Sequence, residues 1–300
     1  MFILSFFLIQ VGTLAAVSIF HSLGTNKDIR NIFSAYSAAG GCCAGLLSGY
    51  FLQSDTDIAI IEIFTDARFL LVLLFEAAAF LIARQNYHHN HQNMTIINAS
   101  LFSSLIFIPI IAFGLSSWLN FENTPSLTFD TPLELAVYIV GLTSLLLLYF
   151  APKIKEKNGI NNWAYIFTTP LVLACTLFLS TKTMQTYNPG YSYALISLFI
   201  VFLSLTLAKS AREFTHASKI EHRRGLKLFF TYCVTLPGYT LGIKLMAVEL
   251  VAVFVRLSQV ISGIALDRFH NDKTLPSKRD LSLLIAILIY AFIFYSLKQG

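Results

Sequence analysis

The chain has 300 residues, of which 56% are hydrophobic and 12% are charged, and its mean hydropathy is +0.67. Because soluble globular domains carry roughly a quarter charged residues, this composition excludes a soluble domain. The net charge of +5 would suggest a nucleic-acid partner in a soluble protein, but basic loops of a membrane protein record its orientation, so we expect no nucleic-acid partner.

Apolar runs of about 20 residues recur along the whole chain, and this is the length that crosses a bilayer core of about 30 Å. They predict an all-α polytopic membrane protein with about ten transmembrane helices. We expect these spans at roughly 1–22, 31–52, 59–84, 95–119, 132–151, 162–181, 189–209, 226–244, 246–266 and 280–297. No soluble domain interrupts them, so we expect one membrane domain over residues 1–300, surrounded by the lipid bilayer.

The Lys and Arg residues are shared unevenly between the two sides of this arrangement. The loops after the odd-numbered spans hold 16 of the 21 Lys and Arg residues, whereas Lys182, Lys244 and Lys298 fall on the other side. Since cytoplasmic loops carry the excess of positive charge, we expect the odd-numbered loops in the cytoplasm and both termini outside it.

Small residues form a regular ridge in the second predicted span. Ser37, Gly41, Gly45 and Gly49 recur every four residues, and so lie along one face of a helix. Small side chains let another helix approach closely in a membrane. The ridge therefore predicts tight helix packing, either within the bundle or between the protomers of a homodimer.

The third predicted span carries a carboxyl group near the middle of the bilayer. Glu76 lies eight residues from both Arg68 and Arg84. Burial from water favours the protonated form of such a carboxyl unless a cation is near, which suits proton coupling or a counter-ion for a cationic substrate. The alternative is a packing residue that is protonated or paired with an arginine such as Arg256. Asp66 and Arg68 are nearer the outer end, where we expect a local salt bridge, although Arg68 is also a candidate substrate-binding residue.

Prolines occur inside three of the predicted spans, at Pro109, Pro170 and Pro237. Broken helices line the cavities of transporters, because helix ends and freed carbonyl groups meet a ligand there. Tyr239, two residues after Pro237, is the best candidate for a cavity wall.

The apolar sequence from Leu228 to Leu266 contains no polar loop and is too long for one crossing. A tight turn at Lys244–Ala247 is the simplest division. The alternative is a break at Pro237–Gly238, followed by a second, tilted span.

The ninth predicted span carries charges inside hydrocarbon. Glu249 and Arg256 are seven residues apart, which is two helical turns, so they lie on one face. Ionisable side chains at this depth are costly and usually face a bundle interior or a watery cavity. We expect a site in which Arg256 holds an anion and Glu249 holds a cation or exchanges a proton; the alternative is an ion pair that fastens two helices. Lys244 is placed in the preceding turn, from which it snorkels to the interface, and it is also a substrate-binding candidate.

Residues for metal or catalytic chemistry are sparse. The cysteines fall inside apolar runs and lack metal-ligand spacing. The histidines of Tyr87–His91 have no defined fourth ligand nearby. Since the spans also lack paired histidines, phosphate-binding glycine loops and Ser–His pairs, we expect no enzyme, no metal and no cofactor.

Two stretches carry a family resemblance. One is Ala67-Arg-Phe-Leu-Leu71, and the other runs from Tyr239 to Tyr295 and includes Gly-Ile-Lys-Leu-Met-Ala-Val-Glu-Leu before Arg256. On these residues, about a third of the chain, the sequence resembles the EamA-like branch of ten-helix exporters in the drug/metabolite transporter superfamily. The resemblance implies two five-helix inverted repeats, with halves at 1–158 and 159–300, around a central cavity. The chain departs from the family in carrying the first motif in its third span rather than its second.

These features together predict a transporter of the bacterial inner (plasma) membrane that exports or exchanges a small metabolite or ion. Its central polar cavity is expected between the third, eighth and ninth spans, with Glu76 coupling to protons. The alternative is a non-transporting membrane subunit of a larger assembly or lipid-handling complex, in which the buried charges contact partner helices.

Overall fold

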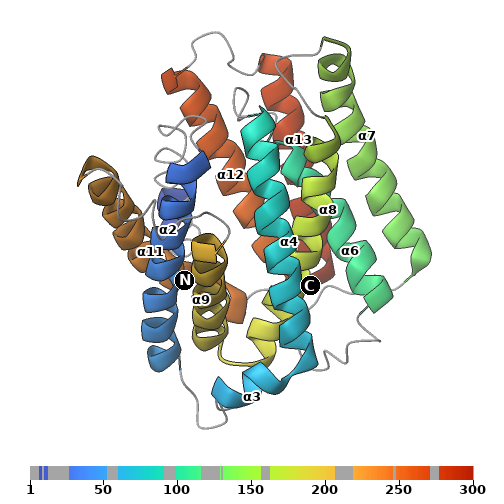
Figure 1. The fold of residues 1–300 in the computed structure, drawn as a ribbon. Coiled ribbons are helices and arrows are strands. Elements are labelled where there is room, and N and C mark those ends of the chain that lie inside the picture. Colours follow the sequence, from blue (N-terminus) through green and yellow to red (C-terminus); the bar gives the residue numbers. More distant parts are fainter. Residues whose placement is uncertain are drawn as a thin grey trace. The chain divides into compact units, whose positions relative to one another are not determined.

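The fold is given by a computed structural model of the chain. It describes residues 7–8, 10–12, 27–52, 60–90, 97, 99–115, 129, 131–156, 163–206, 219–245, 248–270 and 277–299. Every element assigned within these residues is helical (Figure 1): α2 (Lys27–Phe51), α3 (Ile60–Thr65), α4 (Ala67–Asn90), η1 (Leu101–Ser103), α6 (Ser104–Leu115), α7 (Pro132–Glu156), α8 (Trp163–Thr186), α9 (Pro189–Thr206), α11 (Lys219–Leu245), α12 (Val248–His270) and α13 (Lys278–Gln299).

In this described part of the chain, four helices are long and apolar enough to cross a membrane, at Ile32–Phe51, Pro132–Ile154, Trp163–Thr186 and Pro189–Thr206. Apolar side chains exposed along α7 suit contact with lipid, among them Leu133, Val137, Val140, Leu147 and Leu148. The structure is therefore compatible with a helical membrane protein, whereas the prediction of ten spans is not confirmed. The first predicted span, 1–22, lies largely outside the described residues.

Several of the predicted spans differ in their bounds from the helices of the structure, the third and the sixth among them. The third, predicted at 59–84, is divided into α3 and α4, because the chain leaves the helical path at Asp66. The sixth was predicted to end at residue 181, but α8 continues to Thr186. Lys182 is therefore a helix residue rather than the loop residue that the charge pattern predicted, and it is only 2% exposed.

The long apolar stretch from Leu228 to Leu266 divides at the predicted turn. α11 ends at Leu245 and α12 begins at Val248. Pro237 lies inside α11 without ending it, so the alternative break at Pro237–Gly238 is wrong.

Side chains placed just before four helices fix where those helices begin. An oxygen of each accepts a hydrogen bond from a backbone N–H in the first turn, as N-cap residues do. The bonds run from Arg68 to Asp66 (2.7 Å), from Glu134 to Thr131 (3.2 Å), from Gly190 and Tyr191 to Asn188 (3.0 and 3.2 Å) and from Asp280 to Ser277 (3.1 Å). Proline is the first residue of both α7 and α9. It is well tolerated there because a backbone N–H at the first position of a helix would have no acceptor within the helix.

The helices form two compact units, each assembled from segments that are distant in the sequence. Unit 1 comprises Met1–Ala77 and Leu179–Leu245, and unit 2 comprises Ala78–Phe178 and Met246–Gly300. The divisions fall inside α4 and inside α8. Each unit therefore combines residues from both predicted halves of the chain.

The closest approach in unit 1 is that of α2 and α9. The ridge glycines 41, 45 and 49 of α2 lie against Ser197, Ala194 and Tyr191 of α9, in that order. Because the residue numbers rise along α2 while they fall along α9, the two helices are antiparallel. A Cβ atom on Gly45 would lie 2.8 Å from the carbonyl oxygen of Gly190. The backbones are therefore in direct contact, as small residues permit in a membrane. Ser37, the first residue of the ridge, is buried and donates to the carbonyl of its own helix at Ser34.

Asn188 closes the α2–α9 contact at the end of α2. Its Nδ2 donates to the carbonyl oxygen of Gly49 at 3.0 Å, while its Oδ1 caps α9. The residue is 1% exposed, so both groups of the side-chain amide are satisfied away from water.

α11 also packs against α2, and these two helices run parallel. Gly225 lies against Tyr36 and, one turn further on, Phe229 lies against Gly40. The hydroxyl of Tyr36 is 2.9 Å from Nδ1 of His222. α2 is thus held between α9 and α11, which also contact each other.

Unit 2 is centred on the antiparallel pair α7 and α13. Near the start of α7 the hydroxyl of Tyr138 lies 2.9 Å from that of Tyr295 on α13, and near its end Lys153 forms a salt bridge of 2.7 Å with Asp280. α6 packs against α7 and α12, and α12 packs against α13.

Tyr138 also completes the backbone hydrogen bonding of α6. Pro109 lies inside α6 and has no N–H, so the carbonyl group of Leu105, four residues earlier, loses its helical donor. The hydroxyl of Tyr138 donates to that carbonyl at 3.2 Å. Tyr138 is fully buried, so this bond replaces the missing one where water has no access.

We expect Gly45→Ala to destabilise the protein, because the added Cβ would press on the backbone of α9. Overpacking of this kind costs about 1–3 kcal/mol, more than alanine gains as a helix former. Gly114→Ala on α6 is the matched control, since nothing lies within 4 Å of a Cβ atom built there. The melting temperature in detergent should fall for Gly45→Ala and be unchanged or higher for Gly114→Ala. An equal response of both variants would contradict the close α2–α9 contact.

A double-mutant cycle tests the bond between Tyr138 and Leu105. Tyr138→Phe should lower the free energy of unfolding by roughly 1–3 kcal/mol, because it leaves a buried carbonyl group without a donor. In a Pro109→Ala background the N–H restored at residue 109 reaches that carbonyl within α6, so Tyr138→Phe should cost less. Denaturant unfolding of the four proteins in detergent gives the coupling energy. Strictly additive effects would show that Tyr138 does not replace the missing helical bond.

Candidate functional site

Glu76 lies in unit 1 among tyrosines from two other helices. It belongs to α4, while Tyr193 is on α9 and Tyr232 and Tyr239 are on α11. Tyr193 interacts electrostatically with Glu76, Tyr232 and Tyr239. The rings of Tyr193 and Tyr239 are 5.8 Å apart at an angle of 73°, an edge-to-face arrangement. We call these four residues the tyrosine–carboxylate cluster.

The spacing of residues on two helices assembles this cluster. Tyr232 and Tyr239 are seven residues apart, so they lie two turns apart on one face of α11. Ser197 follows Tyr193 by one turn of α9, and its side chain hydrogen-bonds to that of Tyr193. The contact between α9 and α11 then brings the two faces together.

Gly41 of the ridge provides room for Tyr193. A Cβ atom on Gly41 would lie 3.2 Å from the Tyr193 ring and 2.8 Å from the hydroxyl oxygen of Ser197. The backbone of α2 therefore supports the ring from behind. All four side chains of the cluster are half-buried, so each retains some surface that protein atoms do not cover.

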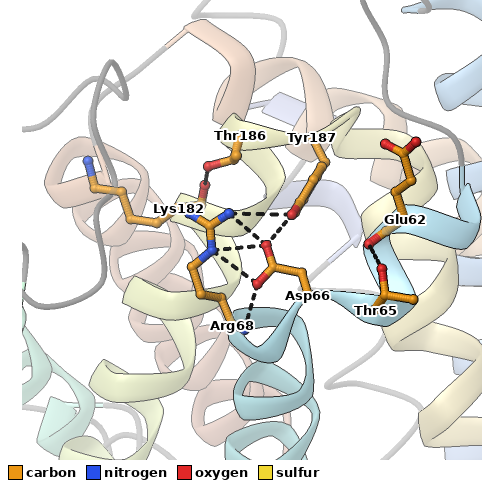
Figure 2. A network of polar contacts seen from close by, with 7 residues as sticks. All are labelled: Glu62, Thr65, Asp66, Arg68, Lys182, Thr186 and Tyr187. Atoms are coloured by element: carbon orange, nitrogen blue, oxygen red, sulfur yellow. Dashed lines mark hydrogen bonds and ion pairs between the residues drawn. The ribbon is translucent and has the colours of Figure 1, made fainter.

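A second polar group surrounds the start of α4 (Figure 2). The Nη2 atom of Arg68 is 2.6 Å from Oδ2 of Asp66, and its Nε is 2.9 Å from the same oxygen. The hydroxyl of Tyr187, in the connection between α8 and α9, donates to the same carboxylate. This is the local salt bridge predicted from the sequence, with a tyrosine added.

Asp66 lies between α3 and α4, outside the four candidate spans. Burial raises the pKa of its carboxyl, but hydrogen bonds from the Arg68 side chain and the Tyr187 hydroxyl outweigh this effect and hold the pKa below its usual value. Figure 2 shows the side chains of Glu62 and Lys182 pointing away from this group. The ion pair is thus saturated by its own partners, which indicates that it joins α4 to the α8–α9 connection rather than receiving a ligand.

The second half of α8 is polar and buried on every side. Residues 176–184 are all buried, including Lys182. The hydroxyl groups of Thr181 and Thr183 find no hydrogen-bond partner among the described residues. Gln185 donates from Nε2 to the carbonyl of Ile243 at the end of α11, at 3.1 Å. Hydropathy did not predict this polar interior.

Arg256, expected to be an anion ligand, lies in unit 2 and is 3% exposed. Its Nε donates to the hydroxyl of Ser104 at 2.8 Å, which links α12 to α6, and its Nη1 donates to the side-chain oxygen of Gln259 at 2.7 Å. Ser104 in turn donates to the carbonyl of Leu101. Ser104 of α6 and Gln259 of α12 thus both hold the guanidinium group.

The remaining predicted residues are not joined to these groups. Lys244 is exposed at the end of α11, and its Nζ donates to the carbonyl of Leu52 at 3.3 Å. Glu249 belongs to α12, but its side chain lies outside the described residues. Glu76 and Arg256 belong to different units, so a cavity shared by Glu76, Glu249 and Arg256 stays a prediction.

Sequence analysis selected Glu76 and Tyr239 but missed Tyr193 and Tyr232. The two-turn spacing of Tyr232 and Tyr239 was a usable signal, whereas nothing local in α9 singles out Tyr193. No family model and no curated protein matches the chain. The resemblance to EamA-like exporters therefore stays a prediction.

Asp66→Asn should lower the stability of the protein at neutral pH by roughly 1–2 kcal/mol, because it removes the charge from a hydrogen-bonded ion pair. The pKa of Asp66 is lower in the folded than in the unfolded protein. The stability that the ionised carboxylate contributes is therefore fully present above the pKa of the unfolded state, and it is lost as the pH falls through the pKa of the folded state. Since the unfolded value is about 3.9, the difference in melting temperature from the wild type should shrink below about pH 4.

Tyr187→Phe is the companion variant for this measurement. It removes one hydrogen bond but keeps the ion pair of Asp66 and Arg68. The stability of this variant should therefore still fall at acidic pH, as that of the wild type does. A wild-type advantage over Asp66→Asn that is constant down to pH 3 would contradict a stabilising role of the carboxylate.

Proposed function

We propose that the protein is an inner-membrane transporter that exports or exchanges a small metabolite or ion. The observation that carries the proposal is a set of helix contacts between the two halves of the chain: α2 packs with α9, besides α11, while α6 packs with α12 and α7 with α13. α2, α6 and α7 follow one another in the first half of the chain. Their partners α9, α12 and α13 follow one another in the same order in the second half.

The direction of the pairs supports an inverted repeat. α2 and α9 are antiparallel, and so are α7 and α13. Two repeats inserted into a membrane in opposite orientations produce antiparallel pairs of corresponding helices. Inverted repeats of this kind are typical of secondary transporters, in which one part rocks against the other and exposes a site to each side in turn.

Polar side chains inside unit 1 support the same proposal. Glu76 is half-buried in α4, and the buried part of α8 contains Lys182 beside Thr181 and Thr183. Polar and ionisable groups within membrane segments are expensive, and they mark solute pathways and proton relays more often than plain packing. We therefore propose that Glu76 couples transport to protons by holding either a proton or the solute.

Reconstitution tests the coupling. Proteoliposomes that contain a pH-sensitive dye should report proton movement when a panel of small amines, amino acids and carboxylates is added. Glu76→Gln should abolish this movement, because an amide does not exchange a carboxyl proton. Glu62→Gln, which changes an exposed carboxyl on α3, is the matched control and should behave as the wild type. Proton movement of wild-type rate in Glu76→Gln would remove Glu76 from the mechanism.

The same vesicles separate transport from the alternative function. A non-transporting membrane subunit of a larger assembly or lipid-handling complex moves no solute in the absence of its partners. Uptake of no member of the panel, measured with labelled solutes as well as with the dye, would overturn the transporter and favour that subunit.

A further inference from the structure

We propose that the tyrosine–carboxylate cluster of unit 1 binds an organic cation, such as an alkylated amine or a quaternary ammonium group. This inference names the substrate class of the proposed transporter and rests on that proposal. It is carried by the edge-to-face ring pair of Tyr193 and Tyr239, which joins α9 to α11. Glu76 of α4 and Tyr232 of α11 lie within electrostatic range of Tyr193.

The rings offer the geometry that a cation requires. The face of a tyrosine ring is negative, and cations bind over it within about 6 Å of the ring centre. The edge-to-face arrangement of Tyr193 and Tyr239, with ring centres 5.8 Å apart, directs two ring faces about perpendicular to each other. Perpendicular faces form two walls of an aromatic cage, and Tyr232 lies within electrostatic range of Tyr193.

Glu76 supplies a formal negative charge to the cluster whenever its carboxyl is ionised. The basic residue that precedes it on α4, Arg68, is eight residues away, or about 12 Å along the helix, and its guanidinium is held by Asp66 at 2.6 Å. Lys244 of the same unit donates to the carbonyl of Leu52. Arg68 and Lys244 therefore have acceptors other than Glu76.

The site is held in place before a ligand arrives. Ser197 binds the Tyr193 side chain, and Gly41 lets the α2 backbone press against the same ring. A ring that is fixed in this way loses little entropy on binding. All four residues are half-buried, so protein atoms cover them only in part, unlike the residues of a fully buried packing cluster.

Other substrate classes fit the cluster less well. An anion would be repelled by the ionised form of Glu76 in a medium of low dielectric constant. A sugar would require a set of hydrogen-bonding groups around its hydroxyls, whereas the three rings offer mostly carbon surface and the Tyr193 side chain is already bonded to Ser197.

Binding to the full-length protein in lipid nanodiscs tests the inference. Benzyltrimethylammonium is the cationic probe and phenylacetate is the anionic control, and both are titrated calorimetrically. We expect Glu76→Gln to weaken binding of the cation at least about tenfold. Tyr193→Leu and Tyr239→Leu should each weaken it roughly 3- to 30-fold, whereas the corresponding Phe variants, which keep the ring, should stay within about threefold of the wild type.

Glu62→Gln, an exposed carboxyl on α3, should bind the cation as the wild type does. Each variant is first checked for a wild-type elution volume and melting curve. If a Leu variant does not fold, Glu76→Gln and the Phe variants still decide the result. Equal binding by the wild type and Glu76→Gln, or tighter binding of phenylacetate than of the cation, would overturn the inference.

Transport and binding are measured separately, so the two proposals can fail independently. Binding of the cation to the cluster without uptake of any solute by proteoliposomes would overturn the transporter and leave the cation site. Uptake of another solute by a protein that does not bind the cation would overturn the cation site and leave the transporter.

Discussion

The close approach of α2 and α9 is the contact on which unit 1 depends. Gly45 lets the two backbones touch, and Asn188 bonds the start of α9 to the end of α2. The same approach sets Tyr193 against Gly41, so the crossing of the helices also determines where the ring lies. In a bilayer, small residues and hydrogen bonds hold helices together, because lipid tails leave little hydrophobic gain from association.

A second constraint is that polar groups inside the protein must find partners without help from water. The carbonyl of Leu105, deprived of its helical donor by Pro109, is bonded by Tyr138 from another helix. The guanidinium of Arg256 is bonded by Ser104 in the same manner. Both solutions place the partner on a neighbouring helix, so they join helices while they satisfy the polar group.

The helical character of the chain and the division between α11 and α12 were predictable, because they depend on local composition and spacing. The burial of Lys182 was not, since hydropathy assigns a lysine to a loop unless distant segments surround it, as they do around α8. The site was predictable in part: Glu76 and Tyr239 are conspicuous within their own helices. Tyr193 joins them through the contact of α9 with α11, which no local pattern records.

The pairing of α2 with α9 has a consequence for biosynthesis. About 140 residues separate the end of α2 from the start of α9. At a synthesis rate of 5–20 residues per second, the glycine face of α2 waits roughly 7 to 30 seconds for its partner. During that interval the small residues that later touch α9 are without this partner. The nascent chain is therefore most open to mispairing while the middle of the protein is being made.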